Sequence, residues 1–375
     1  MQKLNICLVS LTFAPDTQDG AAKFFKGIYE YLKNQGHNVK LITGKWNFKL
    51  LDPNIFQIDI IRRRFFWVPH FNIHAIKYLK QHKFDIIHGN SPKGVLPIIL
   101  ANQKRFISTI HDLGPFETPF TKIPIEKFLI KFVAEKSKFI TTCSDFIRNE
   151  INHYIPKVDL NKIFNLYSAI EEKFKPLPKD AQKLREELGI KGPVILYIGR
   201  IAKYKGVDDV IRAYKEAKKE IPDLTLVIGG KPDFYMDKIY QDWKGKFNDI
   251  LFVGFVSDEE IPIYYSIGDI FITYSYASEG FGLTPIEAIA CGTPVICSSL
   301  NAYKEVLKDN AIFVPPRSPK LLAKEIVNLL KNESQRRNLI TKAQNFVKRY
   351  TWNSVGKKLE VVYQKFINNG KTIHI

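Results

Sequence analysis

The sequence is poor in cysteine and lacks long apolar runs, and each shortage excludes a class of protein. Its four cysteines, among 375 residues, form no Cys-x-x-Cys pair and no metal-ligand spacing. This argues against a disulfide scaffold or a zinc site and for reduced core cysteines. No apolar run approaches the ~20 residues that span a bilayer. The apolar stretch within Met1 to Ala14 is interrupted by Asn5 and precedes no cleavage pattern, which favours a first β-strand over a signal peptide. We therefore expect a cytoplasmic protein, soluble or peripheral at the inner face of the membrane.

Acidic residues are scarce relative to basic ones. Lys and Arg number 56 against 38 for Asp and Glu, giving a formal net charge of +18 at pH 7, and the first half carries the larger share. Basic faces attract phosphates, anionic lipid headgroups or nucleic acid, and charge alone does not choose among them. The length suits two domains of about 150 to 200 residues each.

Short apolar runs alternate with amphipathic stretches along the whole chain, which is typical of parallel sheets with helical crossovers. The strands predicted in the first half are Leu4 to Val9, Asn38 to Thr43, Phe84 to His88, Phe106 to Ile110, Phe139 to Thr142 and Lys162 to Asn165. Those predicted in the second half are Val194 to Ile198, Leu224 to Ile228, Ile250 to Val253, Ile270 to Tyr274, Pro294 to Cys297 and Ala311 to Val314. Between the two series lies Lys173 to Lys191, a charged, proline-bearing segment where we expect the domain linker. The predicted fold class is α/β, with two doubly wound parallel sheets.

A glycine-rich segment in the second half carries two glutamates eight positions apart, Glu279 and Glu287. Thr284 is suited to cap a helix with Pro285 at its first position, and the exposed amides of such a helix bind anions. The segment therefore fits a sugar-nucleotide site. It equally fits a capping box in which Glu287 bonds back to the helix start, with Glu279 as a solvated loop acid.

Ligands of doubly wound sheets bind beyond the carboxyl ends of the strands. Arg200 and Lys205 follow one predicted strand. The planar guanidinium of an arginine and the mobile ammonium of a lysine are together suited to bind a diphosphate. The alternative is a solvated basic loop. His111 follows another strand, either as a donor to a sugar hydroxyl or phosphate or as a structural hydrogen bonder. Gly20 opens the first helix after a long loop, which either presents amides to a ligand or is an ordinary connection.

These segments, taken together, resemble the retaining glycosyltransferases of family four over nearly the whole chain. The matching residues in the second half are Gly199-Arg200, Lys205-Gly206, Gly229-Gly230, Glu279 to Gly282, Glu287-Ala288 and Cys291 to Val295. Those elsewhere are Gly36 to Val39, Ile110 to Asp112, Thr142 to Asp145, Phe174 to Pro176 and Tyr350 to Trp352.

The resemblance implies a GT-B fold, in which two Rossmann-like domains face a central cleft. Residues 1–172 would form the acceptor-side domain, 173–191 the linker and 192–350 the nucleotide-sugar domain. Residues 351–375 would form a last helix that crosses back to the first domain.

The resemblance also implies roles for individual residues. Arg200 and Lys205 would hold the donor diphosphate and stabilise it as it departs, whereas Glu279 would engage hydroxyls of the transferred sugar. His111 would reach the donor sugar and Glu287 the ribose. The remaining donor-binding positions are Gly20, Gly199, Phe255, Val256, Gly280, Phe281, Gly282, Leu283 and Thr284, with Phe255 and Val256 near the base.

The implied reaction moves a hexose-type sugar from a nucleotide-diphosphate sugar, most simply a UDP- or GDP-sugar, to a glycan or lipid-linked acceptor. No Asp-x-Asp occurs, so we expect neither a metal nor another cofactor, with Arg200 and Lys205 in the metal's place. Leu166 to Ile170 stands where the family usually has Pro-Asn-Gly and an acid, which leaves acceptor recognition open.

Two basic stretches of the first half bear on the acceptor. Arg62 to Pro69 sets three arginines beside three aromatics, and Lys122 to Phe139 interleaves lysines with apolar residues. Such surfaces dock on anionic membranes, unless the aromatics pack into the core and the lysines are merely solvated. Two other functions compete with transfer, a GT-B-type nucleotide-sugar epimerase and a basic nucleic-acid-binding protein. No nucleic-acid-binding module is visible, so we expect no nucleic acid as a partner.

Overall fold

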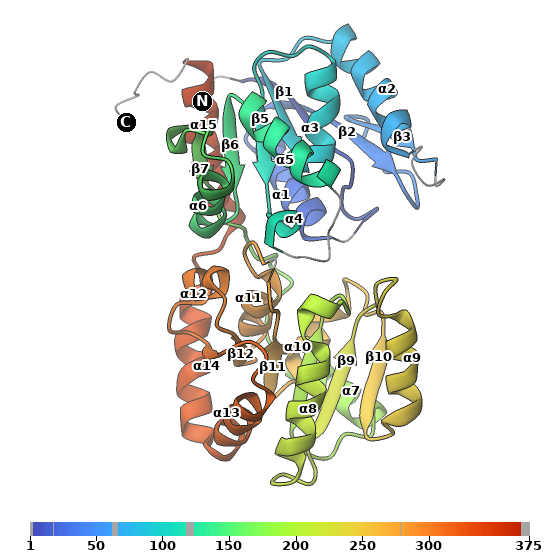
Figure 1. The fold of residues 1–375 in the computed structure, drawn as a ribbon, viewed down its shortest axis with the longest axis vertical. Helices are drawn as coiled ribbons and strands as arrows, with labels where there is room; N and C mark the ends of the chain where they lie inside the picture. The colour runs from blue at the N-terminus through green and yellow to red at the C-terminus, as the bar shows by residue number, and fades with distance from the viewer. Residues whose placement is uncertain (1–2, 18, 62–66, 118–123, 278, 369–375) are drawn as a thin grey trace. The chain divides into compact units, whose positions relative to one another are not determined.

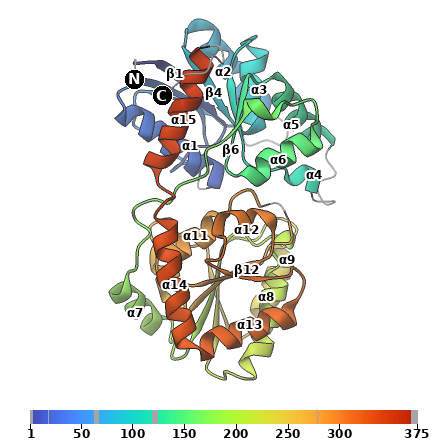
Figure 2. The same ribbon diagram turned by 90° about the vertical axis from the view of Figure 1, so that its left-hand side faces the viewer.

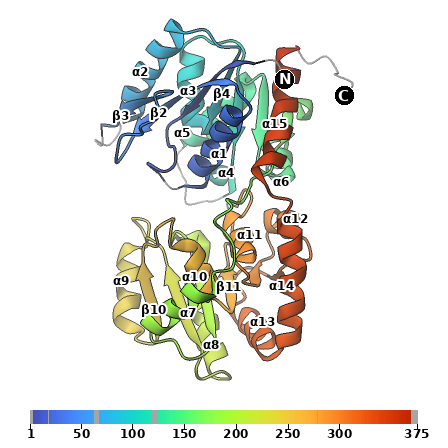
Figure 3. The same cartoon turned by 180° about the vertical axis from the view of Figure 1, so that it is seen from behind.

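A computed structural model describes residues 3–17, 19–61, 67–117, 124–277 and 279–368. The chain divides into two compact units, one made of Met1–Ala169 and Tyr350–Ile375 and the other of Ile170–Arg349. The expected linker contains a helix, α7 (Pro178–Glu187), which packs beside α10 (Ile261–Ile267) in the second unit (Figure 3).

The first unit is built on a parallel sheet of seven strands in the order β3-β2-β1-β4-β5-β6-β7 (Figure 1). Its strands are β1 (Asn5–Ser10), β2 (Asn38–Lys45), β3 (Ile55–Asp59), β4 (Ile86–Asn90), β5 (Ile107–Ile110), β6 (Phe139–Thr142) and β7 (Ile163–Asn165). Its helices are α1 (Gly20–Asn34), α2 (Trp67–Gln81), α3 (Ser91–Leu100), α4 (Gly114–Glu117), α5 (Pro124–Lys136), α6 (Asp145–Tyr154), the short η1 (Leu160–Lys162) and α15 (Trp352–Ile367). The edge strand β3 was not predicted from the sequence.

Each face of this sheet has its own apolar core. Along β1, Ile6 and Leu8 face one core while Cys7 and Val9 face the other, because successive side chains of a strand alternate. Helices α1 and α15 cover the first face and lie beside each other (Figure 2). Helices α2, α3 and α5 cover the second. The last helix of the chain therefore belongs to the first unit, to which residues 352–367 return.

The second unit is built on a parallel sheet of six strands in the order β10-β9-β8-β11-β12-β13. Its strands are β8 (Val194–Ile198), β9 (Thr225–Gly229), β10 (Ile250–Gly254), β11 (Ile270–Thr273), β12 (Val295–Ser298) and β13 (Ile312–Val314). Besides α7 and α10, its helices are η2 (Lys203–Lys205), α8 (Val207–Lys218), α9 (Asp237–Lys246), α11 (Leu283–Ala290), α12 (Asn301–Leu307), α13 (Pro319–Lys331) and α14 (Glu333–Val347). Residues of α8, α9 and α13 form one core with the sheet. The strand order reverses between β8 and β11, and such a switch point is where doubly wound sheets bind ligands.

Candidate functional site

Two loops of the second unit leave the sheet at this switch point. Arg200 lies two residues beyond β8, and Glu279 lies in the loop beyond β11, the strand paired with β8. The loops are tied together by the backbone, since the amide of Tyr276 donates to the carbonyl of Tyr204 at 2.7 Å. The sequence-predicted cations and the first glutamate therefore come together.

Lys205 and Glu279 form an ion pair between the two loops. Their side chains are 20% and 11% exposed, so Glu279 is not the solvated loop acid that the sequence also allowed. The hydroxyl of Ser275 donates to the same carboxylate oxygen, Oε1, at 2.6 Å. Burial lowers the pKa of Lys205, but the charge of Glu279 and its hydrogen bond outweigh burial and the pKa is raised. Lys205 is therefore a firmly charged ammonium at neutral pH.

Tyr204 lies between the two cations. Arg200 Nη2 donates to its hydroxyl, and the Arg200 guanidinium carbon lies 5.6 Å from the centre of its ring. Lys205 Nζ lies 5.1 Å from the same ring centre. The Arg200 side chain is exposed, whereas its carbonyl accepts from the Tyr197 hydroxyl at 3.0 Å. The Tyr204 ring thus lies against both the planar guanidinium of Arg200 and the ammonium of Lys205, two groups that are suited to bind phosphates.

Glu287 lies on α11 and is buried. Its Oε2 accepts a hydrogen bond from the Tyr265 hydroxyl at 3.0 Å. Burial, followed by the charge of Glu287, raises the pKa of Tyr265 well above its usual range, so this hydroxyl keeps its proton and donates. Sequence reasoning found Glu287 but not Tyr265, which comes from another helix.

The start of α11 differs from the prediction. The helix begins at Leu283 with Gly282 as its N-cap, so Thr284 is not the cap and Pro285 is not the first helical residue. Gly282 has a φ of 87°, a conformation that favours glycine. A Cβ there would lie 2.6 Å from the Tyr303 ring. Gly282 therefore allows the turn to begin earlier than the threonine-proline pattern indicated. Of its neighbours, Phe281 is buried and Gly280 half-buried.

The other predicted donor residues of this unit are Gly199, in the same loop as Arg200, and Phe255 and Val256, in the loop after β10. The Gly199 amide donates to the Gly229 carbonyl at 3.0 Å, which ties the loop after β8 to the last residue of β9. After β10, Val256 is buried, whereas Phe255 is 52% exposed and has Lys231 Nζ 4.4 Å from its ring centre.

His111 and Gly20 lie in the first unit, at the ends of β5 and the start of α1. Asn90, at the end of β4, connects His111 to Ala21, the residue after Gly20, and the sequence did not reveal this role. Its Nδ2 donates to the Ala21 carbonyl at 3.1 Å and to Ser10 Oγ at 2.9 Å, which fixes the orientation of the amide. Asn90 Oδ1 therefore faces His111 Nε2 as an acceptor at 2.7 Å, and Nε2 carries the ring proton. Burial lowers the pKa of His111 to about 4, so the ring is neutral and Nδ1 is its accepting atom.

Helix α5 carries the second basic stretch and presents apolar side chains outward. Ile125 is 72% and Phe128 67% exposed, and Lys127 and Lys131 are also exposed. The same helix buries Val133 in the core. The alternative in which these side chains pack into the core is thus wrong for Ile125 and Phe128. Residues 62–66 and 118–123 lie outside the described residues, and so does most of the predicted stretch from Arg62 to Pro69.

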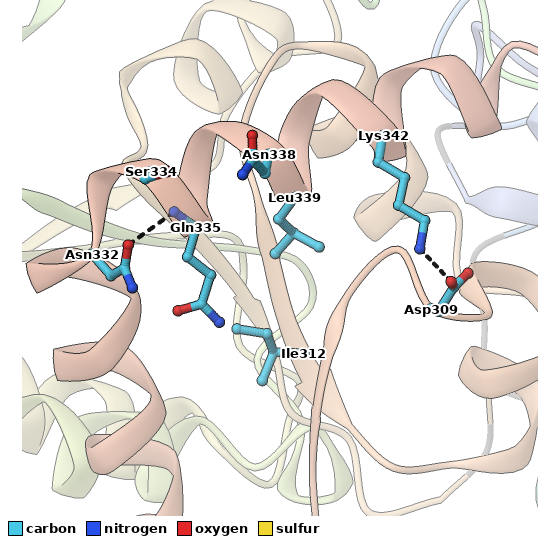
Figure 4. A pocket seen from close by; sticks show the side chains of 8 residues that line it. All are labelled: Asp309, Ile312, Asn332, Ser334, Gln335, Asn338, Leu339 and Lys342. Carbon is cyan, nitrogen blue, oxygen red and sulfur yellow. Dashed lines mark hydrogen bonds and ion pairs between the residues drawn. The ribbon is translucent and has the colours of Figure 1, made fainter.

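A separate hollow of about 490 Å³ lies along α14 in the second unit (Figure 4). Lys342 and Asp309 form an ion pair at one end, and Asn332 Oδ1 accepts from the Gln335 amide at 2.9 Å at the other. Its lining includes none of the predicted donor residues.

The described residues contain neither a metal-binding cluster nor a membrane-spanning helix. No group of three or more His, Cys, Asp or Glu side chains there has a metal-binding arrangement. Within the same residues, no helix has the length and apolar character needed to cross a membrane.

Two family models match the chain and together cover most of it. Residues 180–346 match the model of glycosyl transferases group 1, and residues 18–171 match that of glycosyltransferase family 4. An uncharacterized glycosyltransferase of Methanocaldococcus jannaschii is 25% identical over 392 aligned positions, covering 96% of this chain and 98% of that protein.

Two solved structures share the fold over nearly the full length. Sucrose-phosphate synthase from Thermosynechococcus elongatus has a TM-score of 0.84 at 20% identity, covering 97% of this chain and 100% of the other. HepE from Anabaena, in complex with UDP-glucose, has a TM-score of 0.79 at 18% identity, covering 96% of this chain and 100% of the other.

Proposed function

Because the chain belongs to glycosyltransferase family 4 and has the GT-B fold, we propose a retaining, metal-independent hexosyl transfer from a nucleotide sugar. The donor is a UDP- or GDP-sugar, and the acceptor is a glycan or a lipid-linked sugar. The observation that carries the proposal is the meeting of Arg200, Lys205 and Glu279 on two loops from neighbouring strands.

The two cations have the task of stabilising the departing diphosphate. As the bond between the anomeric carbon and the diphosphate oxygen breaks, negative charge grows on the leaving group. Fixed positive groups aimed at such charge contribute several kcal/mol to catalysis. Arg200 supplies a planar guanidinium and Lys205 a compact ammonium, and both groups lie against the ring of Tyr204. The acceptor attacks from the face that the diphosphate leaves, so configuration is retained.

The glutamates recognise the rest of the donor. Glu279 accepts hydrogen bonds from hydroxyls of the transferred sugar. Glu287 accepts from the ribose hydroxyls, while its Oε2 also accepts from the Tyr265 hydroxyl. Neutral His111 contributes an accepting Nδ1 for a substrate hydroxyl, and Gly20, Gly199 and residues 280–284 contribute backbone amides. Phe255 and Val256 border the base.

The exposed face of α5 supports a lipid-linked acceptor. Ile125 and Phe128 are apolar groups in water, flanked by exposed lysines. That combination suits shallow insertion into an anionic membrane surface. We accordingly place the reaction at the cytoplasmic face of the membrane.

A ligand screen followed by a product assay tests this function. UDP, GDP and ADP, alone and as glucose or mannose conjugates, are compared by thermal shift, because a ligand at 100 times its Kd stabilises the folded chain by about 2.7 kcal/mol. The stabilising sugar nucleotide is then incubated with glycolipid acceptors, and the anomeric configuration of the product is read by NMR. Release of nucleoside diphosphate that depends on acceptor, with retained configuration, is expected. Conversion of the donor sugar without acceptor would instead identify an epimerase.

A further inference from the structure

A series of hydrogen bonds links Glu279 to a residue of helix α12. Tyr303 lies on α12 and is buried, with its hydroxyl 2.9 Å from Thr273 Oγ1 and 3.5 Å from Ser275 Oγ. Ser275 is fully buried and donates to Glu279 Oε1 at 2.6 Å. Thr273, Ser275 and Glu279 all belong to the end of β11 and its loop, whereas Tyr303 approaches from outside.

These hydroxyls have a consistent direction of donation. Ser275 has one proton, which goes to Glu279 because a carboxylate only accepts. Ser275 Oγ is then left as an acceptor for Tyr303, and Tyr303 accepts in turn from Thr273. The series of hydrogen bonds therefore runs from Thr273 through Tyr303 and Ser275 to Glu279, and each hydroxyl proton is donated once.

The ring of Tyr303 has a second contact with the donor loops. It lies so close to Gly282 that a Cβ on that residue would be 2.6 Å from the ring. The same side chain thus supports the turn that begins α11 and the serine that orients Glu279. Buried networks in which every group is satisfied rigidify their surroundings.

We propose that Tyr303 is a positioning residue for the transferred sugar: it holds Ser275, and Ser275 holds Glu279 in the orientation that receives the sugar hydroxyls. The inference rests on the proposed role of Glu279. Lys205 competes for the same oxygen, Oε1, and among the described residues none donates to Oε2. Without Ser275 the carboxylate would follow Lys205 towards the diphosphate. With Ser275 in place, Oε2 stays available to the sugar while Lys205 moves to phosphate.

The test separates recognition of the sugar from recognition of the nucleotide. Isothermal titration of the full chain measures Kd for UDP and for UDP-glucose, or for the corresponding pair on the base selected by the ligand screen. Tyr303→Phe keeps the ring against Gly282 and removes only the hydroxyl. We expect this variant to weaken binding of the sugar nucleotide about tenfold, or ~1.4 kcal/mol, relative to binding of the nucleoside diphosphate. Ser275→Ala is expected to give the same ratio, and the double variant no further loss.

Tyr265→Phe is the matched control, because it also removes a buried tyrosine hydroxyl that supports a donor-site glutamate, in this case by donating to Glu287 directly. Since its partner Glu287 binds the ribose, which both ligands contain, binding of the two ligands is expected to weaken by the same factor. An unchanged ratio of the two Kd values in Tyr303→Phe, with folding intact by circular dichroism, would overturn the positioning role. Failure of the unaltered chain to bind any sugar nucleotide would instead reject the proposed function, and the positioning role with it.

Discussion

Lys205 and Glu279 are oppositely charged residues on separate loops, and they form an ion pair with each other. Desolvation makes an isolated buried charge costly, and pairing offsets that cost. The pair therefore sets a basic and an acidic side chain next to each other at the switch point of the second sheet. A bound diphosphate would take over part of the interaction of Lys205, and a sugar hydroxyl that of Glu279.

The first prediction concerns Lys205. Lys205→Ala is expected to lower kcat by about 10² to 10³, the usual cost of removing one donor from a charge-stabilising site. Donor Kd should change much less, because the leaving charge develops only in the transition state. Steady-state kinetics and titration measure the two quantities. Lys203→Ala is the control, since it removes the same charge from an exposed position two residues away. Equal losses in the two variants would show that only general positive charge matters.

A second prediction concerns Glu287. Glu287→Ala is expected to weaken binding of nucleoside diphosphate and sugar nucleotide alike by roughly 10- to 100-fold, as hydrogen bonds to a charged group are lost. Calorimetric titration with both ligands gives the two constants. Because Glu287 is buried against Tyr265, Glu287→Gln serves as the folding control: it keeps an oxygen for the tyrosine. Normal affinity in the alanine variant would remove Glu287 from the donor site.

Much of the fold is visible in the sequence because buried parallel strands are nearly continuous apolar runs. Val194–Ile198, which is buried throughout, was predicted with its exact bounds. Strand Ile55–Asp59 was missed because it is a short edge strand with a single buried residue. A strand of that kind has no apolar run to detect.

The site was predictable only where charge marks it. Arg200, Lys205 and Glu279 stand out as charged residues after apolar strands, and the structure brings them together. Ser275, Tyr303 and Asn90 gave no signal, because a serine, a tyrosine and an asparagine have ordinary explanations anywhere. Their partners come from other elements: Tyr303 reaches Ser275 across 28 positions of sequence. Such contacts depend on packing, which a local pattern does not encode.

A third prediction concerns metal ions. Transfer is expected to continue unchanged after dialysis against EDTA and to gain nothing from added magnesium or manganese, because Arg200 and Lys205 supply the charge that a metal would otherwise provide. The assay is acceptor-dependent release of nucleoside diphosphate. Loss of activity in EDTA that either metal restores would contradict the proposal and assign the diphosphate to a bound cation.

A fourth prediction follows from two histidines of the first unit, of which His88 is buried and His111 half-buried. Burial, with a smaller effect of nearby His111, lowers the pKa of His88 to about 3, and burial lowers that of His111 to about 4. Unfolded histidines titrate near 6.5, so below that pH the unfolded chain binds more protons than the folded one. The free energy of unfolding is therefore expected to fall as pH decreases from 6.5 to 5, by up to ~1.4 kcal/mol per pH unit for each histidine.

Urea denaturation at pH 5.0, 5.5, 6.0, 6.5 and 7.5 measures this slope. His111→Gln removes one of the two contributions and is expected to reduce the slope while leaving that of His88. A slope that is the same in the variant and the unaltered chain would mean that His111 is as easily protonated in the folded state as in the unfolded one.

The last prediction concerns the exposed face of α5. Ile125 and Phe128 present apolar surface beside Lys127 and Lys131, so the chain is expected to sediment with vesicles that contain anionic lipid and not with neutral ones. Raising the salt concentration should weaken the association, because exposed charges are screened. Replacing both Ile125 and Phe128 by serine should reduce binding at constant charge. Phe234→Ser is the control, since Phe234 is 91% exposed in the second unit. If Phe234→Ser reduced binding as much as the α5 variant, or if the unaltered chain failed to sediment at low salt, α5 would not be the docking surface.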